Sequence, residues 1–295
     1  MPMRSLAVRI VSLDSQRTLR ESQLENSRQL VEFTRKRLES AEAAAVDVLQ
    51  LELDVRQLEA EVLQLTTERT TLVGELRPQL GIGPEDDPVI RGELPAPVRI
   101  PSPSGSLARP DLQAARANVD AARSAAALAR AQKWEDIGVG IAAQTERGMD
   151  APEGYERDQF IGFRLSVPLP LWNDNSGRVR EADAAAARRV KEVEALTLTI
   201  RTEIEAARAE MATLAKLLET LNESLLPAAT QIEDLLRISY TTGQAPLTDV
   251  LRARDRRLLL ERQRIDALRE YHLARVRYES AQGRTPAAKT TRKSK

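Results

Sequence analysis

Residues 240–251, YTTGQAPLTDVL, join two long helix-forming segments and have a counterpart earlier in the chain. Residues 38–49, LESAEAAAVDVL, align with them at a constant offset of 202 residues and share the Asp-Val-Leu triplet. The offset continues without a gap over 38–81 and 240–283, and each copy ends at a glycine. An ungapped register over this length indicates one structural unit present twice, with each unit packing against its partner.

The composition is typical of long packed helices. The chain has 295 residues, 44 basic and 44 acidic residues, no cysteine and only 3% aromatic residues. Zero net charge gives no global field that would attract nucleic acid. Without cysteine there is no disulfide framework, thiolate zinc site or lipidated cysteine. No run of about 18 apolar residues is present, so no transmembrane helix is predicted.

The first repeat is predicted to be a helical hairpin. Residues 12–40 form the first helix, and 39–45 form a short break. Residues 46–80 have the 4-3 spacing of a left-handed coiled coil, with Arg69 as the one interruption. The apolar residues of this seam are Leu51, Val55, Leu58, Val62, Leu65, Leu72 and Leu76.

Four parts are expected along the chain. Residues 1–83 are the helical hairpin, the C-terminal part of the first repeat, and 84–109 are an extended connector rich in proline and glycine. Residues 110–283 form the second repeat, and the basic tail 284–295 is predicted to be disordered.

Three helical segments are predicted in the second repeat. The first covers about 110–134 and is dense in alanine, and the second runs from about 178 to 224. Pro227 interrupts the second segment, which then resumes to Tyr240. The last helix covers about 247–282.

A β-hairpin is predicted over residues 136–172, where the apolar period changes from 3.6 to 2. The strands are connected by a polar loop over 144–158. Arg164 and Ser166 lie on one face of the second strand, among small residues and prolines. The other face is apolar throughout, with Ile161, Phe163, Leu165, Val167, Leu169 and Leu171.

Two interpretations of this hairpin remain open from the periodicity. A strand that crosses a bilayer needs about 9–11 residues, apolar toward lipid, polar toward the lumen and flanked by aromatic residues. Phe160, Phe163 and Trp172 fit such an aromatic girdle. The alternative is an amphipathic hairpin packed on a soluble helical core. Two strands alone do not close a barrel, and lipid tolerates no open edge, so further strands would be required.

The turns between the paired helices are candidate docking tips. In the second turn, Gly243 is expected to supply a left-handed helix cap. The first turn has Ala41 at the corresponding position, so we expect it to be less tight. The alternative interpretation is an ordinary helix–turn–helix that binds no partner. The candidate tip residues are Tyr240, Thr241, Thr242, Gly243, Gln244 and Ala245, together with Ser40, Ala41 and Glu42.

No catalytic site, cofactor site or metal site is predicted. His272 is the only histidine, and a structural role is expected for it. The sequence contains no nucleophile–base pair, phosphate-binding glycine loop or metal-ligand motif. The acidic residues of 144–158 match no cation-binding loop pattern. We therefore expect a protein that is not an enzyme.

Several motifs together resemble the TolC-like outer-membrane efflux proteins. They are Arg109-Pro110-Asp111-Leu112 at the start of an alanine-rich helix, the strand end 167–172 (VPLPLW), Leu225-Leu226-Pro227, and Tyr240-x-x-Gly243 leading to Asp249-Val250-Leu251. The first repeat contributes Asp47-Val48-Leu49 and Gly81. The resemblance covers about 12–283 and is nearest to the CzcC-like branch, which serves heavy-metal efflux pumps.

The resemblance implies a mainly α fold, in which long antiparallel coiled-coil helices accompany a β-hairpin that joins a shared trimeric outer-membrane barrel. It implies a homotrimer in the outer membrane with a periplasmic helical tunnel. The tips would meet a periplasmic adaptor, and an inner-membrane pump of the resistance–nodulation–division class would supply the energy. Ile161 to Leu171, at alternate positions, would face lipid, and Arg164 and Ser166 would face the lumen.

The same resemblance implies that a first strand pair is missing. An offset of 202 places the counterpart of the hairpin before Met1, so roughly 90 residues and any signal peptide are expected to be absent, through a misassigned start codon or a truncated gene. Arg9 splits the apolar run near the N-terminus, and no signal peptide is predicted there. Six strands from three such chains are not expected to close a barrel.

Two other function classes are alternatives to the channel. The heptad seam and the missing signal favour a soluble coiled-coil scaffold, which would be a soluble rod without affinity for detergent. A periplasmic adaptor with a helical hairpin would need flanking β-rich domains, and the sequence predicts none.

Overall fold

The computed structural model describes residues 2–86, 88–90, 92–98, 109–132, 137–150, 154–167 and 175–283. The chain forms two compact units. One contains residues 1–107 and 200–295, and the other contains residues 108–199. Leu169, Leu171, Trp172 and the predicted tail 284–295 lie outside the described residues.

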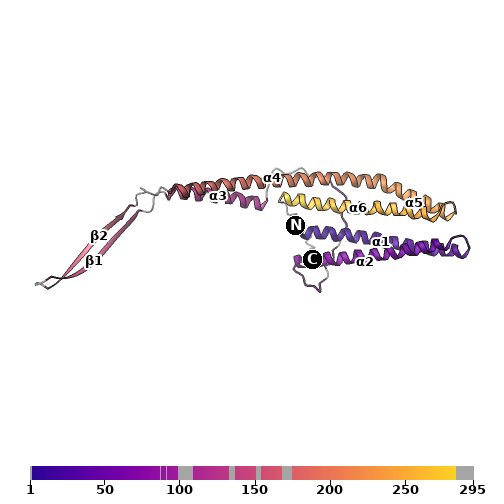
Figure 1. Ribbon diagram of the computed structural model, residues 1–295, viewed down its shortest axis with the longest axis horizontal. Helices are drawn as coiled ribbons and strands as arrows, with labels where there is room; N and C mark the ends of the chain where they lie inside the picture. Colours follow the sequence, from indigo (N-terminus) through magenta and orange to yellow (C-terminus); the bar gives the residue numbers. More distant parts are fainter. Residues whose placement is uncertain are drawn as a thin grey trace, which may run out of the picture. The chain divides into compact units, whose positions relative to one another are not determined.

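The first unit is a layer of long antiparallel helices. Its helices are α1 (Pro2–Glu39), α2 (Ala45–Leu80), α5 (Leu226–Thr241) and α6 (Leu247–Ala281), together with the part of α4 (Ser176–Thr220) that begins at Ile200. The helix α1 packs on α2 and on α6, and α6 packs on α5, so α2 and α5 are the two edges of the layer (Figure 1). The predicted fold class is confirmed, and α1 begins ten residues earlier than expected.

The predicted heptad seam of α2 faces α1. Leu51, Leu58 and Leu76 are buried, and Leu51 belongs to an apolar cluster near the turns with Val31, Tyr240, Leu247 and Val250. Arg69, the interruption of the seam, donates from Nε to Asp14 Oδ1 of α1 at 2.7 Å. A charged residue is tolerated in the seam because a carboxylate on the neighbouring helix pairs with it.

The two helix turns have the same geometry at the same offset of 202. Ala41 has φ 61° and Gly243 has φ 77°, both left-handed. The Ala41 and Gly243 amides donate to the carbonyls three residues earlier, both at 3.0 Å, and the amides that follow donate to the carbonyls five residues earlier, both at 2.7 Å. The expectation of a looser first turn is therefore wrong, because alanine adopts the left-handed conformation that glycine adopts in the second turn.

A π-helical segment accommodates Pro227 without ending the helix. The helix α4 (Ser176–Thr220) continues through the π-helix η1 (Leu221–Leu225) directly into α5. The Leu226 amide donates to the carbonyl of Leu221, five residues earlier. Proline lacks an amide hydrogen, and a wider turn lets the chain continue past it. The predicted interruption is a local widening of the helix.

The second unit contains α3 (Pro110–Ala131), β1 (Gly138–Asp150), β2 (Gly154–Ser166) and the first part of α4. Arg130 of α3 forms an ion pair with Asp183 of α4 at 2.5 Å. The two strands pair in antiparallel register over their whole length. The predicted polar loop over 144–158 is wrong, since most of it belongs to the strands.

Candidate membrane hairpin and helical tip

The hairpin has one apolar face, contributed by both strands. Directly paired residues share a face, and Val139 pairs with Leu165, Ile141 with Phe163 and Ala143 with Ile161. All of them are exposed in the chain, Phe163 to 84%. Val167 follows β2 and is also exposed. A continuous exposed apolar surface of this kind marks an interaction with lipid or with another protein.

Polar and small residues form the opposite face. Arg164 pairs with Gly140, and Ser166 pairs with Gly138. The two faces are thus divided as the alternation predicts. Phe160 pairs with Gln144, which places it on the face of Arg164. The predicted girdle of Phe160 and Phe163 is therefore wrong, because residues three apart in a strand point to opposite faces.

Beyond the apolar region, the hairpin continues with polar residues on both faces. Thr145 pairs with Gln159, and Arg147 pairs with Arg157, all exposed. The sequence predicts a loop here because this half lacks apolar alternation. The antiparallel pairing nevertheless continues through it, as far as Asp150 opposite Gly154, and the side-chain pattern alone does not reveal this.

The two turns expose most of the predicted tip residues. Thr241, Thr242, Gly243 and Gln244 are exposed, as are Ser40, Ala41 and Glu42. Ala245 is half-buried and Tyr240 is buried. Both threonine hydroxyls donate to the carbonyl of Ile238, which fixes the side chains against the end of α5.

Tyr240, near the end of α5, contacts residues near the end of α1 and so links the two turns. Its Oη lies 3.3 Å from Thr34 Oγ1, and its carbonyl accepts from Arg37 Nη1 at 3.0 Å. The Arg37 guanidinium also lies 5.2 Å from the Tyr240 ring centroid, a cation–π distance. Sequence reasoning missed Arg37 and Thr34. A cation in the last turn of a helix is a signal that could have pointed to Arg37.

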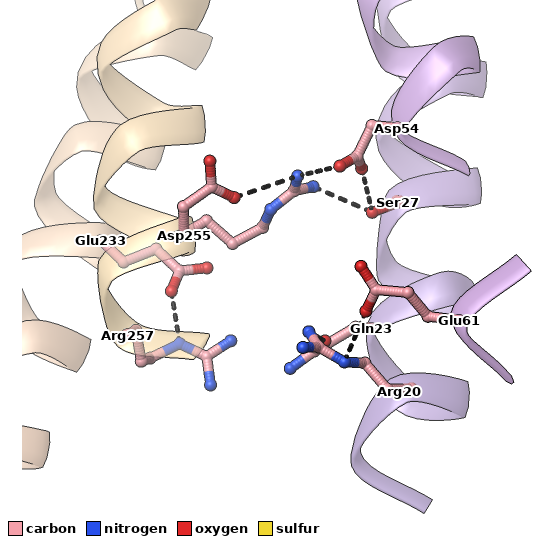
Figure 2. A network of polar contacts seen from close by, with 9 residues as sticks. Arg20, Gln23, Ser27, Asp54, Glu61, Glu233, Asp255 and Arg257 are labelled. Carbon is pink, nitrogen blue, oxygen red and sulfur yellow. Dashed lines mark hydrogen bonds and ion pairs between the residues drawn. The ribbon is translucent and has the colours of Figure 1, made fainter. Parts of the chain in front are cut away.

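A polar network joins α6 to the α1–α2 pair further along the layer. Arg254, which is buried, donates to Ser27 Oγ at 2.9 Å and pairs with Asp54 Oδ1 at 2.7 Å. Ser27 in turn donates to Asp54 Oδ2 at 3.0 Å. Figure 2 shows Ser27 and Asp54 together on one side of the network and Asp255 on the other. These bonds fix the relative axial positions of α1, α2 and α6.

Two smaller groups flank this network (Figure 2). Arg20 pairs with Glu61 at 2.9 Å, which ties α1 to α2. Arg257 pairs with Glu233 of α5. Each helix of the layer is therefore bound to its neighbour by charged groups as well as by apolar packing.

His272 holds the connector against α6. It is buried, and its Nε2 donates to the Pro95 carbonyl at 2.8 Å. The hydroxyl of Tyr271 accepts from the Val98 amide at 3.1 Å and donates to the Val98 carbonyl at 2.9 Å. Burial lowers the pKa of His272, while the bond to Pro95 acts in the other direction. The structural role expected for this histidine agrees with its position.

Within the described ranges, no group of three or more potential metal ligands comes together. Over the same residues, no helix is both long enough and apolar enough to cross a bilayer.

Comparisons with known proteins identify relatives of this fold and sequence. The cobalt-zinc-cadmium resistance protein CzcC of Cupriavidus metallidurans is 25% identical over 182 residues, which are 62% of this chain and 38% of CzcC. The outer membrane protein VceC of Vibrio cholerae has a similar structure, with a TM-score of 0.73 and 20% identity over 95% of this chain and 68% of VceC. The outer-membrane channel OprN gives a TM-score of 0.76 and 20% identity over 95% of this chain and 65% of OprN.

The chain spans well under half the length of CzcC and about two thirds of the length of these channel structures. The similarity to OprN and VceC confirms the mainly helical fold with a hairpin. The profile of the family described as outer membrane efflux protein matches residues 106–284, more than half of the chain. This is a transport family of the outer membrane with a helical periplasmic tunnel, as predicted, and not a family of enzymes. The chain belongs to the outer membrane efflux protein family.

Proposed function

We propose that the protein is the outer-membrane channel component of a tripartite efflux pump, a passive exit duct for metal cations or small toxic compounds. The exposed apolar face of the hairpin carries this proposal. Within one chain the face around Ile141, Phe163 and Leu165 has no cover, and the family match supplies the outer membrane as its environment. The side with Arg164 and Ser166 then faces the lumen.

The proposed assembly is a homotrimer with a shared barrel. A two-stranded hairpin leaves both strand edges unpaired, and an edge in lipid would have unsatisfied backbone groups. Strands from further copies would satisfy them. The long helices of each copy would line a periplasmic tunnel.

The exposed turn residues are proposed to dock a periplasmic adaptor, which connects the channel to an inner-membrane pump of the resistance–nodulation–division class. Thr241 to Gln244 and Ser40 to Glu42 form this surface, and the buried Tyr240 supports it. The shared geometry of the turns supports a docking surface that repeats around the assembly.

We propose a metal cation as the transported substrate. Its support is the similarity to CzcC, a protein named for cobalt, zinc and cadmium resistance.

Deletion of the gene tests the proposal. Loss of the protein should increase cellular accumulation of cobalt, zinc or cadmium, and the wild-type gene should reverse the increase. The Gly243→Val variant should fail to reverse it while reaching the outer membrane in normal amount, because a branched side chain is strained at φ 77° in the tip. Gly74→Val is the matched control and should complement, because Gly74 lies in α2 away from the turns and a side chain there would meet no neighbouring atom.

Unchanged accumulation of all three metals and of general toxic compounds after deletion would refute the channel. Full complementation by Gly243→Val would remove the docking role of the tip alone. The soluble scaffold alternative accounts for the helices, but it leaves the exposed face of the hairpin unexplained.

A further inference from the structure

The polar half of the hairpin has two arginines side by side. Arg147 of β1 pairs directly with Arg157 of β2, and both are exposed. Directly opposed residues of an antiparallel pair lie on the same face, with their Cβ atoms about 4.5–5.5 Å apart. Two guanidinium groups at this spacing repel each other, so the pair destabilises the hairpin unless an anion binds between them.

The chain supplies no counter-ion for this pair among the residues that the structure describes. Within them, neither Arg147 nor Arg157 has an ionic partner. The neighbouring carboxylates, Glu146 and Asp158, pair with each other one position along the strands. Adjacent residues of a strand point to opposite faces, so these carboxylates lie on the far face of the hairpin. An anion that joins the two arginines must come from outside the chain.

The arginine pair lies on the same face as the apolar surface of the hairpin. This face changes in order from apolar through neutral polar to basic, because every second residue of a strand faces the same way. The successive pairs are Val139–Leu165, Ile141–Phe163, Ala143–Ile161, Thr145–Gln159 and Arg147–Arg157. A bilayer changes in the same order from its hydrocarbon core to its charged headgroups.

The spacing along the strand agrees with the thickness of the headgroup layer. Arg157 lies four residues beyond Ile161, about 13 Å along an extended strand. At the usual tilt of membrane strands, ~35–45°, this is about 10 Å along the membrane normal. The polar layer on each side of the hydrocarbon is roughly 5–8 Å thick, and the long arginine stem lets the guanidinium reach back into it.

The chain order gives the side of the membrane. The helix α3 precedes β1 and α4 follows β2, so both helices join the hairpin at its apolar end. With the helices in the periplasm, the arginine pair at the far end of the strands reaches the outer leaflet.

Guanidinium groups in this arrangement select a phosphate. Each donates two parallel hydrogen bonds to phosphate oxygens in a fixed fork, and two neighbouring forks hold a phosphorylated headgroup from both sides. The hydroxyl of Thr145 and the amide of Gln159, one pair nearer the core, suit the neutral polar groups of the same headgroup. The adjoining apolar face accommodates acyl chains, which favours a lipid over a free phosphate ion.

We propose that Arg147 and Arg157 bind the phosphorylated headgroup of an outer-leaflet lipid, whose acyl chains lie against the apolar face at Ile161 and Phe163. The inference rests on the proposed function, because that function places the apolar face in the outer membrane. The bound headgroup neutralises the arginine pair and fixes the depth of the hairpin in the bilayer.

Lipid binding to the purified full chain in an uncharged detergent tests this site. The probes are bisphosphorylated lipid A, the same lipid after removal of both phosphates, and inorganic phosphate. Arg147→Gln combined with Arg157→Gln should bind bisphosphorylated lipid A roughly 30-fold more weakly than the wild type, since each basic residue near an anionic surface contributes about fivefold. The lipid without phosphates should bind both proteins equally.

Arg164→Gln is the matched control, because it removes the same charge from the opposite face of the hairpin. It should bind bisphosphorylated lipid A as the wild type does. Arg147→Lys combined with Arg157→Lys should retain part of the affinity, since the charge remains and the fork is lost. The double glutamine variant should fold at least as stably as the wild type, because it removes a like-charge pair.

Equal affinities of the wild type and the double glutamine variant for bisphosphorylated lipid A would overturn the proposal. An equal loss in Arg164→Gln would do the same, because it would reveal an effect of net charge alone. Displacement of the lipid by an equal concentration of inorganic phosphate would assign the arginines to a free anion. If the lipid binds as expected but deletion of the gene leaves metal accumulation unchanged, only the proposed function fails.

Discussion

Ala41 and Asn175 are the non-glycine residues with positive φ among those the structure describes. At Ala41 the left-handed conformation costs about 1–2 kcal/mol, partly offset because alanine restricts the unfolded chain more than glycine does. Ala41→Gly should therefore raise the free energy of unfolding by roughly 0.5–1 kcal/mol in chemical denaturation. Gly243→Ala, the reverse change in the equivalent turn, should lower it by a similar amount. A loss of stability in Ala41→Gly would contradict the shared turn geometry.

Asp54 neutralises the buried Arg254 and also accepts from Ser27. Asp54→Asn should lower the free energy of unfolding by about 1.5–3 kcal/mol, since hydrogen bonds to charged groups contribute this much. Asp234→Asn removes an exposed pair with Arg237 and should cost less than about 1 kcal/mol. Equal losses of unfolding free energy in urea denaturation would show that the network in Figure 2 stabilises the protein no more than an exposed ion pair does.

His272 should make the packing of the connector depend on pH. Burial lowers its folded-state pKa below its unfolded value of about 6.5, so the unfolded chain binds the proton more readily. Stability from this group is complete above about pH 6.5 and falls as the pH drops through the folded-state pKa. His272→Gln should show a smaller decline of thermal stability between about pH 7.5 and 5 than the wild type. Parallel declines would exclude the histidine as the cause.

At the scale of elements, the hairpin allows a test of which strand face is turned toward lipid. Leu165→Arg places a charge on the apolar face and should cost roughly 2–4 kcal/mol of folding free energy near the bilayer centre. Arg164→Leu, on the opposite face, should have a much smaller effect. The measurement is the amount of each variant that folds in the outer membrane. Equal effects of the two changes would refute the assignment of faces.

The elements show which parts of the fold the sequence could predict. Heptad spacing located α2, and apolar alternation located the part of the hairpin around Phe163 and Leu165, because in both patterns the apolar residues lie on one side of the element. The polar half of the hairpin lacks such a pattern, so its strands were mistaken for a loop. The π-helix before Pro227 was also missed, since a proline signals a lost hydrogen bond but not how the helix compensates.

The candidate site was predicted less completely than the fold. The exposed tip residues follow from the turn signal at Gly243. The burial of Tyr240 and its contact with Arg37 depend on α1 packing on α6, which brings the end of α1 to Tyr240 at the end of α5, and no local pattern contains this. The left-handed conformation of Ala41 was not predicted, because alanine rarely adopts it, although the repeat places Ala41 on Gly243.

At the scale of the whole molecule, the repeat unifies these observations. Two copies of a helical unit form a layer whose edges, α2 and α5, remain uncovered, and the hairpin has an uncovered apolar face. The proposed occupants of these bare surfaces are further copies of the chain for the helices and outer-membrane lipid for the hairpin. The hairpin is thus proposed to lie in the outer membrane, and the helical tips in the periplasm.

Labelling of single cysteines in cells that express the chain from its own locus tests that claim directly. Gly148→Cys lies in the polar half of the hairpin with free space around it, and Gln244→Cys lies at the tip. A maleimide too large to cross the outer membrane should label Gly148→Cys on intact cells and should label Gln244→Cys only after the outer membrane is opened. Labelling of both sites only after complete lysis would contradict the account.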